Sequence, residues 1–240
     1  MRVNRLSFIV IALSIFLTGC LYPDERRGEN RIPYEDQIAS VQSAVIQYRQ
    51  DYGVLPIKTR EADTPIFRKY PVNFGQLIPK YIQSAPGNSF ENGGVFQYVL
   101  VNPEEIPEVK LIDLTTTREI QEFQRRIQQY RRQHDYAPVK EIVGNELMRL
   151  DYKALNYEEE PTISSPFHPN HRLPLLMRTN GDIVVDYSLD IIHYIDEHET
   201  DEYESGDDLR WLLVDHSPFV PAYSIPQTVK NNEVIFLDEN

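Results

Sequence analysis

Two stretches of the chain, 38–58 and 120–140, repeat one pattern at an offset of 82 residues, and this repeat constrains the fold more than any other feature. Seven of the 21 aligned positions are identical. In each stretch the apolar and aromatic residues recur at alternating steps of three and four, which predicts an amphipathic helix with one buried stripe. The predicted stripes are Ile38, Val41, Val45, Tyr48 and Tyr52 in the first stretch, and Ile120, Phe123, Ile127, Tyr130 and His134 in the second.

The identities extend beyond what two amphipathic helices need. A Tyr-Arg pair begins at Tyr48 and again at Tyr130, and a proline follows each tyrosine after eight residues. Convergence on a similar stripe would require neither feature, so both favour an internal duplication. Gly53 suits the left-handed position that closes a helix, and Asp135 occupies the equivalent slot. The sequence Thr-Thr-Arg-Glu at 116–119 predicts a capping box at the start of the second helix.

Similar elements are expected after the two helices. In the first half we expect a short helix over 73–82 and strands over 95–101 and 109–114. In the second half we expect a short helix over 146–155 and strands over 173–178 and 183–187. Asn180-Gly181 lies between the last two strands and predicts a hairpin with a type I′ turn, because that turn needs positive φ at both central residues.

The sequence therefore predicts an α+β fold of two tandem related units, each a long amphipathic helix packed on a small antiparallel sheet. A C-terminal cap would pack on the second unit. The expected segments are a signal peptide at 1–19, a linker at 20–33, a first unit at 34–114, a second unit at 115–195, an acidic loop at 196–208 and the cap at 209–240.

The N-terminus has the features of an export signal. Two arginines precede an apolar run of twelve residues, 6–17, which is too short for a hydrocarbon core of about 30 Å and is typical of a signal peptide. The run ends in Leu17-Thr-Gly-Cys20, which resembles the lipobox of bacterial lipoproteins. Cys20 is the only cysteine. The resemblance implies a diacylglyceryl group on its sulfur, and hence an anchor in the cell membrane at its extracytoplasmic face.

The charge balance narrows the choice of partners. The formal net charge is −13, and loss of residues 1–19 would remove two arginines and no acidic residue, giving −15. A field of this sign repels nucleic acid and attracts cations and basic partners. Besides the membrane, which the lipid on Cys20 would contact, we expect a protein partner and no nucleic acid.

Catalytic motifs are scarce in this sequence. It contains no Gly-x-Ser-x-Gly, no phosphate loop and no His-Glu-x-x-His. We therefore assign no catalytic residue, no metal ligand and no cofactor, and expect no enzyme activity. The alternative is a metal-dependent or wall-acting enzyme with His168, His171 and His193 as ligands beside neighbouring acids. A helix over 190–197 would align Asp190, His193 and Glu197 on one face, whereas a strand would separate them.

Two charged segments remain. Residues 196–208 hold eight acidic residues without the order of a calcium-binding loop, so a solvated loop is expected. On the second helix, arginines recur every seven residues opposite the apolar stripe, forming either an ordinary exposed face or a docking surface for a partner. These arginines are Arg118, Arg125 and Arg132.

Two wider resemblances bear on function. A helix ending in Tyr-x-x-x-x-Gly-x-x-Pro before a small antiparallel sheet resembles the globular part of pseudopilins, although a lipobox and a polar linker replace their long apolar helix. The whole chain is similar to uncharacterised surface lipoproteins of Gram-positive bacteria. The expected function is a membrane-anchored, non-catalytic binding or assembly factor at the cell envelope. A pseudopilin-like component of an export machine is a further alternative.

Overall fold

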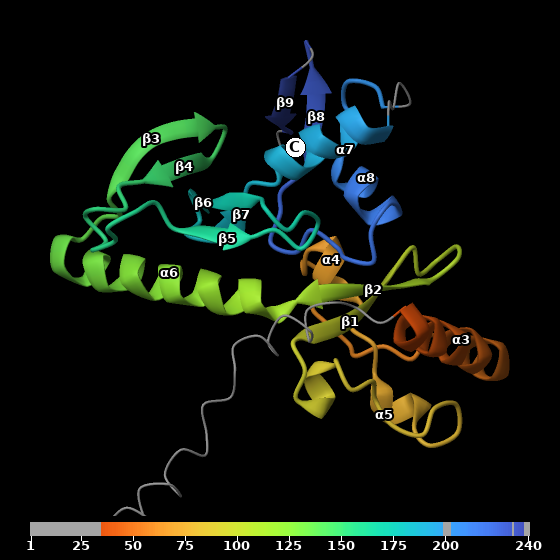
Figure 1. Cartoon of the computed structure of the whole chain (residues 1–240). Coiled ribbons are helices and arrows are strands. Elements are labelled where there is room, and N and C mark those ends of the chain that lie inside the picture. The colour runs from red at the N-terminus through yellow and green to blue at the C-terminus, as the bar shows by residue number, and fades with distance from the viewer. Residues whose placement is uncertain (1–34, 199–202, 232, 238–240) are drawn as a thin grey trace, which may run out of the picture. The chain divides into compact units, whose positions relative to one another are not determined.

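The computed structural model describes residues 35–198, 203–231 and 233–237 (Figure 1). These residues belong to one compact unit, 33–240. Helices and small antiparallel sheets make up an α+β fold, as the sequence predicts. Cys20, the expected signal peptide and the expected linker lie outside the described residues.

Helix α3, Glu35–Tyr52, is the first predicted amphipathic helix. Its buried residues are Val41, Ala44, Val45 and Tyr48, whereas Tyr52 at the end of the predicted stripe is 55% exposed. Gly53 closes the helix with a φ of 71°, and its N–H donates to the Arg49 carbonyl at 2.8 Å. This left-handed closure is the one that the sequence predicts.

Helix α3 packs on a two-stranded antiparallel sheet of β1, Phe96–Val101, and β2, Glu108–Asp113. Phe96, Tyr98 and Leu100 join the core beneath α3, whereas Val99 and Val101 join a second core on the opposite face. This division follows from the alternation of side chains along a strand. Short helices contribute to both cores: α5 (Phe74–Leu77) to the first and α4 (Ile66–Lys69) to the second, with the turn η1 (Phe90–Asn92) preceding β1.

Helix α6, Leu114–His134, is the second predicted helix and begins directly after β2. The predicted capping box is wrong, because Asp113 caps the helix instead and accepts from the Thr115 N–H at 2.8 Å. The buried side chains are Thr116, Ile120, Phe123 and Ile127. Asp135 closes α6 with a φ of 65° and donates its N–H to the Arg131 carbonyl at 2.8 Å.

Helix α6 packs on a five-stranded antiparallel sheet. Strand β6 is central. Along one edge its first residues pair with β5 and its last residues pair with β4, and along the opposite edge it pairs with β7. The predicted strands 173–178 and 183–187 correspond to β6 and β7. The strands are β3 (Val139–Gly144), β4 (Leu147–Leu150), β5 (Thr162–Ser164), β6 (Arg172–Arg178) and β7 (Ile183–Val185).

The predicted helix over 146–155 is wrong. Residues 147–150 form β4, in which Met148 lies opposite Met177 of β6, and turns follow. Pairing in the sheet buries Leu147 and Leu150, so tertiary contacts override the local helix preference.

The hairpin at Asn180-Gly181 forms as predicted, but its turn type differs from the prediction. Gly181 has a φ of 92°, whereas Asn180 is not among the residues with positive φ. The Gly181 N–H donates to the Arg178 carbonyl at 2.9 Å. This pattern matches a three-residue loop, in which a left-handed glycine follows a type I turn.

The C-terminal part consists of α7 (Ser188–His198), α8 (Arg210–Asp215) and the hairpin of β8 (Gln227–Lys230) and β9 (Glu233–Phe236). Helix α7 extends to residue 198, so the segment expected as an acidic loop from 196 begins inside a helix. Leu209 and Leu212 pack in the core of α6. Leu111 of β2 donates to the Pro218 carbonyl at 2.9 Å and accepts from the Val220 N–H at 3.0 Å. The segment predicted as a cap on the second unit thus also joins the sheet of the first.

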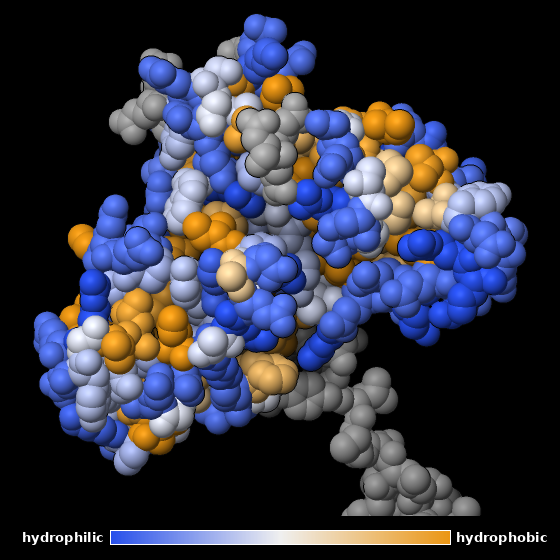
Figure 2. All heavy atoms as spheres, turned by 180° about the vertical axis from the view of Figure 1, so that it is seen from behind, coloured by the Kyte–Doolittle hydropathy of each residue, from blue (hydrophilic) through white to orange (hydrophobic). Residues whose placement is uncertain are grey.

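No helix within the described ranges is both long and apolar enough to cross a membrane. Hydrophilic residues predominate on the face drawn in Figure 2, and apolar residues gather there in separate groups. Large exposed side chains such as Ile142 and Ile106 are normal for a globular surface.

Candidate functional site

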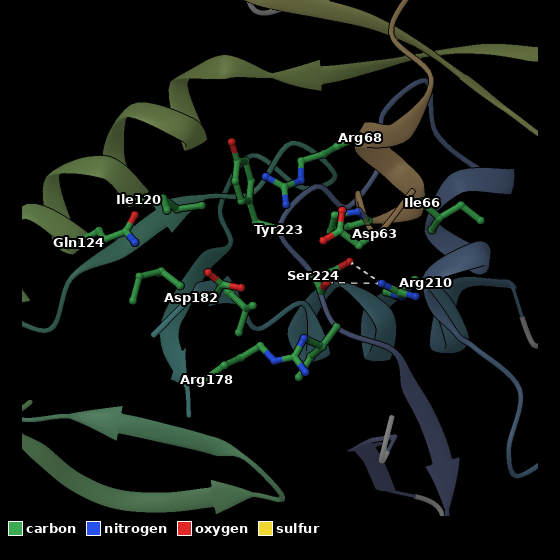
Figure 3. Close-up of a pocket in the computed structure, with 14 residues that line it drawn as sticks. Asp63, Ile66, Arg68, Ile120, Gln124, Arg178, Asp182, Arg210, Tyr223 and Ser224 are labelled. Carbon is green, nitrogen blue, oxygen red and sulfur yellow. Dashed lines mark hydrogen bonds between the residues drawn. The ribbon is translucent and has the colours of Figure 1, made fainter. Parts of the chain in front are cut away.

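An arginine-lined cavity of about 380 Å³ lies where α4, α6, the β6–β7 hairpin and the segment after α8 meet (Figure 3). A wider depression of about 640 Å³ adjoins it and shares six of its residues. Cavities of this size are typical of small-molecule sites. The polar residues that line the smaller cavity are Asp63, Arg68, Gln124, Arg178, Asp182, Arg210, Tyr223 and Ser224.

Arg68 is the least engaged cation of the cavity. Its neighbour Phe67 is buried beneath the first sheet, and the helical turn directs Arg68 away from that core. The guanidinium carbon lies 4.3 Å from the centroid of the Tyr223 ring, which is a cation–π contact. Its Nε is buried without a hydrogen-bond partner. Among the described residues nothing forms a hydrogen bond or ion pair with the Arg68 guanidinium, so its accessible N–H groups remain available to a ligand.

Arg210, by contrast, is held by its neighbours. It is 7% exposed, and its Nη2 donates to Asp208 Oδ2 at 2.6 Å. Its Nη1 donates to Ser224 Oγ at 3.2 Å, as drawn in Figure 3. Arg178 also has a carboxylate beside it, since its Nη2 lies 3.5 Å from Glu146 Oε2. Both arginines line the cavity, and the positive charge of each is balanced by a carboxylate of the protein.

Two further groups of the lining have no partner in the described part of the chain: the carboxylate of Asp63 and the amide of Gln124. Gln124 corresponds to Gln42 in the sequence repeat. The Gln42 amide donates to the Pro107 carbonyl at 2.8 Å and accepts from the Val109 N–H at 2.7 Å. The same residue type thus ties α3 to β2 at position 42 and lines the cavity at position 124.

The carboxylate of Asp182 is held in the β6–β7 loop, where Asn180 Nδ2 donates to its Oδ2 at 2.9 Å. Asp182 and Asp63 are both exposed to solvent at the cavity. The described lining contains arginine, aspartate, glutamine, serine and tyrosine but no histidine or cysteine. This set suits the binding of a small polar molecule through charge and hydrogen bonds.

The three arginines predicted as a docking stripe lie elsewhere, on the exposed side of α6. Arg125 pairs with Glu122 within the helix, whereas no ion pair engages Arg118 or Arg132 in the described ranges. Partner binding by Arg118, Arg125 and Arg132 stays a prediction. Their neighbour Arg126 is structural, because it donates to the Asn156 carbonyl at 2.8 Å and lies 4.0 Å from the Tyr157 ring centroid.

The histidines of the expected proline-rich loop meet α7. The rings of His168 and His171 are stacked with centroids 3.9 Å apart, and His193 lies 4.7 Å from His168. A second stack joins His198 and His216 at 3.9 Å. The structure therefore gathers five imidazoles around one helix, three of which were candidates in the sequence.

Asp190 of α7 holds the loop of His168 and His171 in place. Its carboxylate is fully buried, lies 2.6 Å from His171 Nδ1 and accepts from Ser165 Oγ at 2.7 Å. Burial raises the pKa of Asp190, while hydrogen bonds from His171 and Ser165 act to lower it. Burial, with the imidazoles of His171 and His193, lowers the pKa of His168. Because the carboxylate separates serine from histidine, this is no nucleophile–base arrangement.

The predicted stripe of Asp190, His193 and Glu197 does lie on a helix, but its members do not converge. His193 Nε2 lies 3.5 Å from Glu197 Oε2, whereas Asp190 faces the core. Across the described ranges, no three His, Cys, Asp or Glu side chains are arranged to hold a metal ion.

One family comparison bears on this chain: residues 34–113 match the YphF family N-terminal domain. The match covers the expected first unit, 34–114, to within one residue. No curated relative and no solved structure is significantly similar to the chain. The match therefore relates the first unit to a family whose description names no ligand or activity.

Sequence reasoning missed the cavity. Arg68 and Asp63 come from a charged segment with no recognisable motif, and their neighbours Asp182 and Tyr223 lie more than a hundred residues away. Among the polar residues of the lining, only Gln124 carried a signal, as one of the seven positions identical between the repeats.

Proposed function

We propose that this protein is a lipid-anchored, extracytoplasmic factor of the cell envelope that binds a ligand or partner without catalysing a reaction. The observation that carries the proposal is Leu17-Thr-Gly-Cys20 at the end of a twelve-residue apolar run. Acylation of Cys20 would tether the folded part through a polar linker, and two acyl chains suffice for stable anchoring.

The folded part offers two surfaces for binding. One is the cavity around Arg68, whose uncommitted donors suit a small ligand. The other is the exposed stripe of Arg118, Arg125 and Arg132, which is basic in an otherwise acidic chain and suits an acidic protein partner.

We further propose that the two units arose by duplication of the helix and its closure. Gly53 and Asp135 are 82 residues apart, both are left-handed, and both donate to an arginine carbonyl four residues earlier. The segments that follow the two closures differ, since α4 and α5 come after the first helix whereas β3 and β4 come after the second.

The anchor is tested by comparing the wild-type chain with Cys20→Ala in cells. We expect the wild type in the membrane fraction, degraded by protease added outside the cells, and the variant released from the membrane or retained as an unprocessed precursor. Arg118→Ala, which leaves the lipobox intact, should fractionate as wild type. Equal membrane attachment of wild type and Cys20→Ala would overturn the proposal.

A metal-dependent enzyme is the second candidate, favoured by the close approach of His168, His171 and His193. Rotation of these rings would be needed to direct their nitrogens at one ion. Metal analysis of the purified chain, and its melting temperature with and without Zn²⁺, test this alternative. The metal-dependent enzyme predicts bound metal, or a rise in melting temperature with Zn²⁺ that His168→Asn abolishes. Absence of both results would exclude it.

A further inference from the structure

The cavity leaves groups of both charges without partners. Arg68 presents a guanidinium whose face rests on Tyr223 and whose N–H donors are unused. Asp63 presents a carboxylate that is likewise unpaired in the described part of the chain. In Figure 3 these two side chains lie beside each other, and Asp182 lies across the opening. Arg68 and Asp63 nevertheless form no ion pair, so each can take a ligand group of opposite charge.

Stacking prepares Arg68 for an oxyanion that presents two oxygens side by side. A guanidinium held by its face on an aromatic ring keeps its edge free, and that edge fits the two oxygens of a carboxylate or phosphate. Because Tyr223 already restricts the side chain, less rotamer entropy is lost on binding. Of the Arg68 donors only Nε is buried without a partner, so the two Nη groups are the donors that an oxyanion in the cavity would meet.

The charge around the cavity is close to balanced, which restricts the ligand further. Three arginines line it, and among the described residues at least four carboxylates either line it or pair with these arginines. A ligand with net negative charge would be repelled by the unpaired carboxylates, and a cation by Arg68. The four carboxylates are Asp63, Asp182, Asp208 and Glu146.

We propose that the cavity binds a small zwitterion, with its oxyanion on Arg68 and its ammonium group on Asp63 and Asp182. Gln124 adds a neutral donor and acceptor to the site. A free amino acid, a short peptide or a zwitterionic phospholipid headgroup shares this chemistry. The inference deepens the binding role proposed above and is independent of the lipid anchor, since every group it uses lies in the folded part.

Calorimetric titration of the full-length chain in detergent tests the proposal with matched probes. The dipeptide Ala-Ala carries both charges, its N-acetyl form lacks the ammonium group and its amide lacks the carboxylate. Ala-Ala should bind with a Kd below about 10 mM, and each blocked form about tenfold or more weakly. Glycerophosphoethanolamine replaces the dipeptide in a parallel arm, and tighter binding in that arm identifies a lipid headgroup as the source of the zwitterion.

Variants connect the binding to named groups. Arg68→Ala should lose about tenfold in affinity and no longer distinguish Ala-Ala from its amide, while Arg68→Lys retains the charge without the fork and should be intermediate. Combined Asp63→Asn and Asp182→Asn should no longer distinguish Ala-Ala from its N-acetyl form. Arg118→Ala removes the same charge outside the cavity and should bind as wild type.

The readout on Arg68 itself is the NMR correlation of its Nε–H, which should shift with Ala-Ala and stay unchanged with the amide. Absence of binding by both zwitterionic probes up to about 10 mM would overturn the proposal. So would wild-type affinity in a folded Arg68→Ala variant. Either result leaves the membrane attachment of the wild type unaffected, so failure here is distinct from failure of the lipid anchor.

Discussion

The guanidinium of Arg68 lies 4.3 Å from the ring centroid of Tyr223. This stacking connects α4 to the segment that follows α8. Arg68 gains no hydrogen bond from this position, and its buried Nε is left unsatisfied. An unmade buried hydrogen bond costs about 1–3 kcal/mol, which stability alone would not favour. Such a group in a native structure calls for an explanation, and its position in the lining of the cavity is the one offered by this fold.

The first prediction concerns Arg68 and stability. Arg68→Met should change the free energy of unfolding by less than about 1 kcal/mol, because removal of the unsatisfied Nε offsets the lost stacking of about 0.5–2 kcal/mol. Arg210→Met is the matched control and should cost about 2–4 kcal/mol, since it leaves Asp208 unpaired. Urea unfolding measures both. An equally large loss in the two variants would show that Arg68 is structural.

The second prediction concerns the two helix closures. Gly53→Ala should destabilise the protein by about 1 kcal/mol, because φ at this position is 71° and alanine disfavours the left-handed region. No atom lies within 4 Å of a Cβ added there, so no steric clash adds to the strain in the backbone. Asp135→Gly should stabilise by about 0.5 kcal/mol for the same reason. Thermal unfolding measures both changes, and effects of equal sign would contradict the equivalence of the closures.

The third prediction separates two adjacent arginines of α6. Arg126→Ala should destabilise by about 1–2 kcal/mol, because the side chain donates to the Asn156 carbonyl and packs on Tyr157. Arg125→Ala should fall within about 0.5 kcal/mol of wild type, since its partner Glu122 is on the same exposed helix face. Urea titrations measure the free energy of unfolding of both variants. A larger loss in Arg125→Ala than in Arg126→Ala would contradict the structural role of Arg126.

The fourth prediction concerns acid sensitivity at His168. Its pKa is lowered by burial and by His171 and His193, with Asp190 and Glu197 acting in the opposite direction. The folded state therefore resists protonation, so the contribution of His168 is fully present above the unfolded pKa of about 6.5 and is lost as the pH falls toward the lowered folded value. Asp190 works against this loss, because its raised pKa lets the folded state take up a proton more readily than the unfolded state.

The measurement is the free energy of unfolding at pH 7.5 and at pH 5.5. Wild type should be less stable at the lower pH, and His168→Asn should lose less, because asparagine takes up no proton in this range. Asparagine also retains an acceptor for the Asn170 N–H, so the loop contact is kept. His134→Gln, at an exposed histidine outside the cluster, should lose as much as wild type. Identical losses in all three proteins would exclude His168 as the sensitive group.

Local patterns in the sequence predict the two long helices well. The period of apolar residues places α3 and α6, and Gly53 marks a closure that the structure reproduces. Strands β1, β2, β6 and β7 lie within or close to their predicted ranges, because their apolar runs are bounded by turn residues. The C-terminal ends of the predicted stripes were wrong, since Tyr52 and His134 are exposed at the last residue of each helix.

The elements and the site that depend on distant partners were not predicted. Residues 147–150 contain good helix formers, yet pairing with β6 makes them a strand. The cavity joins Asp63, Gln124, Asp182 and Tyr223 only through tertiary contacts. Gln124 shows the difficulty: the repeat identifies it as shared with Gln42, but only the fold shows that one amide is bonded and the other faces an opening.

The central claim is that the mature protein begins at an acylated Cys20. Mass spectrometry of the protein purified from cell membranes tests it most directly, because it reads both the first residue and the mass attached to it. We predict an N-terminal peptide that starts at Cys20 and carries a diacylglyceryl group on its sulfur. A peptide that retains residues 1–19, or one that starts at an unmodified Cys20, would contradict the proposed anchor.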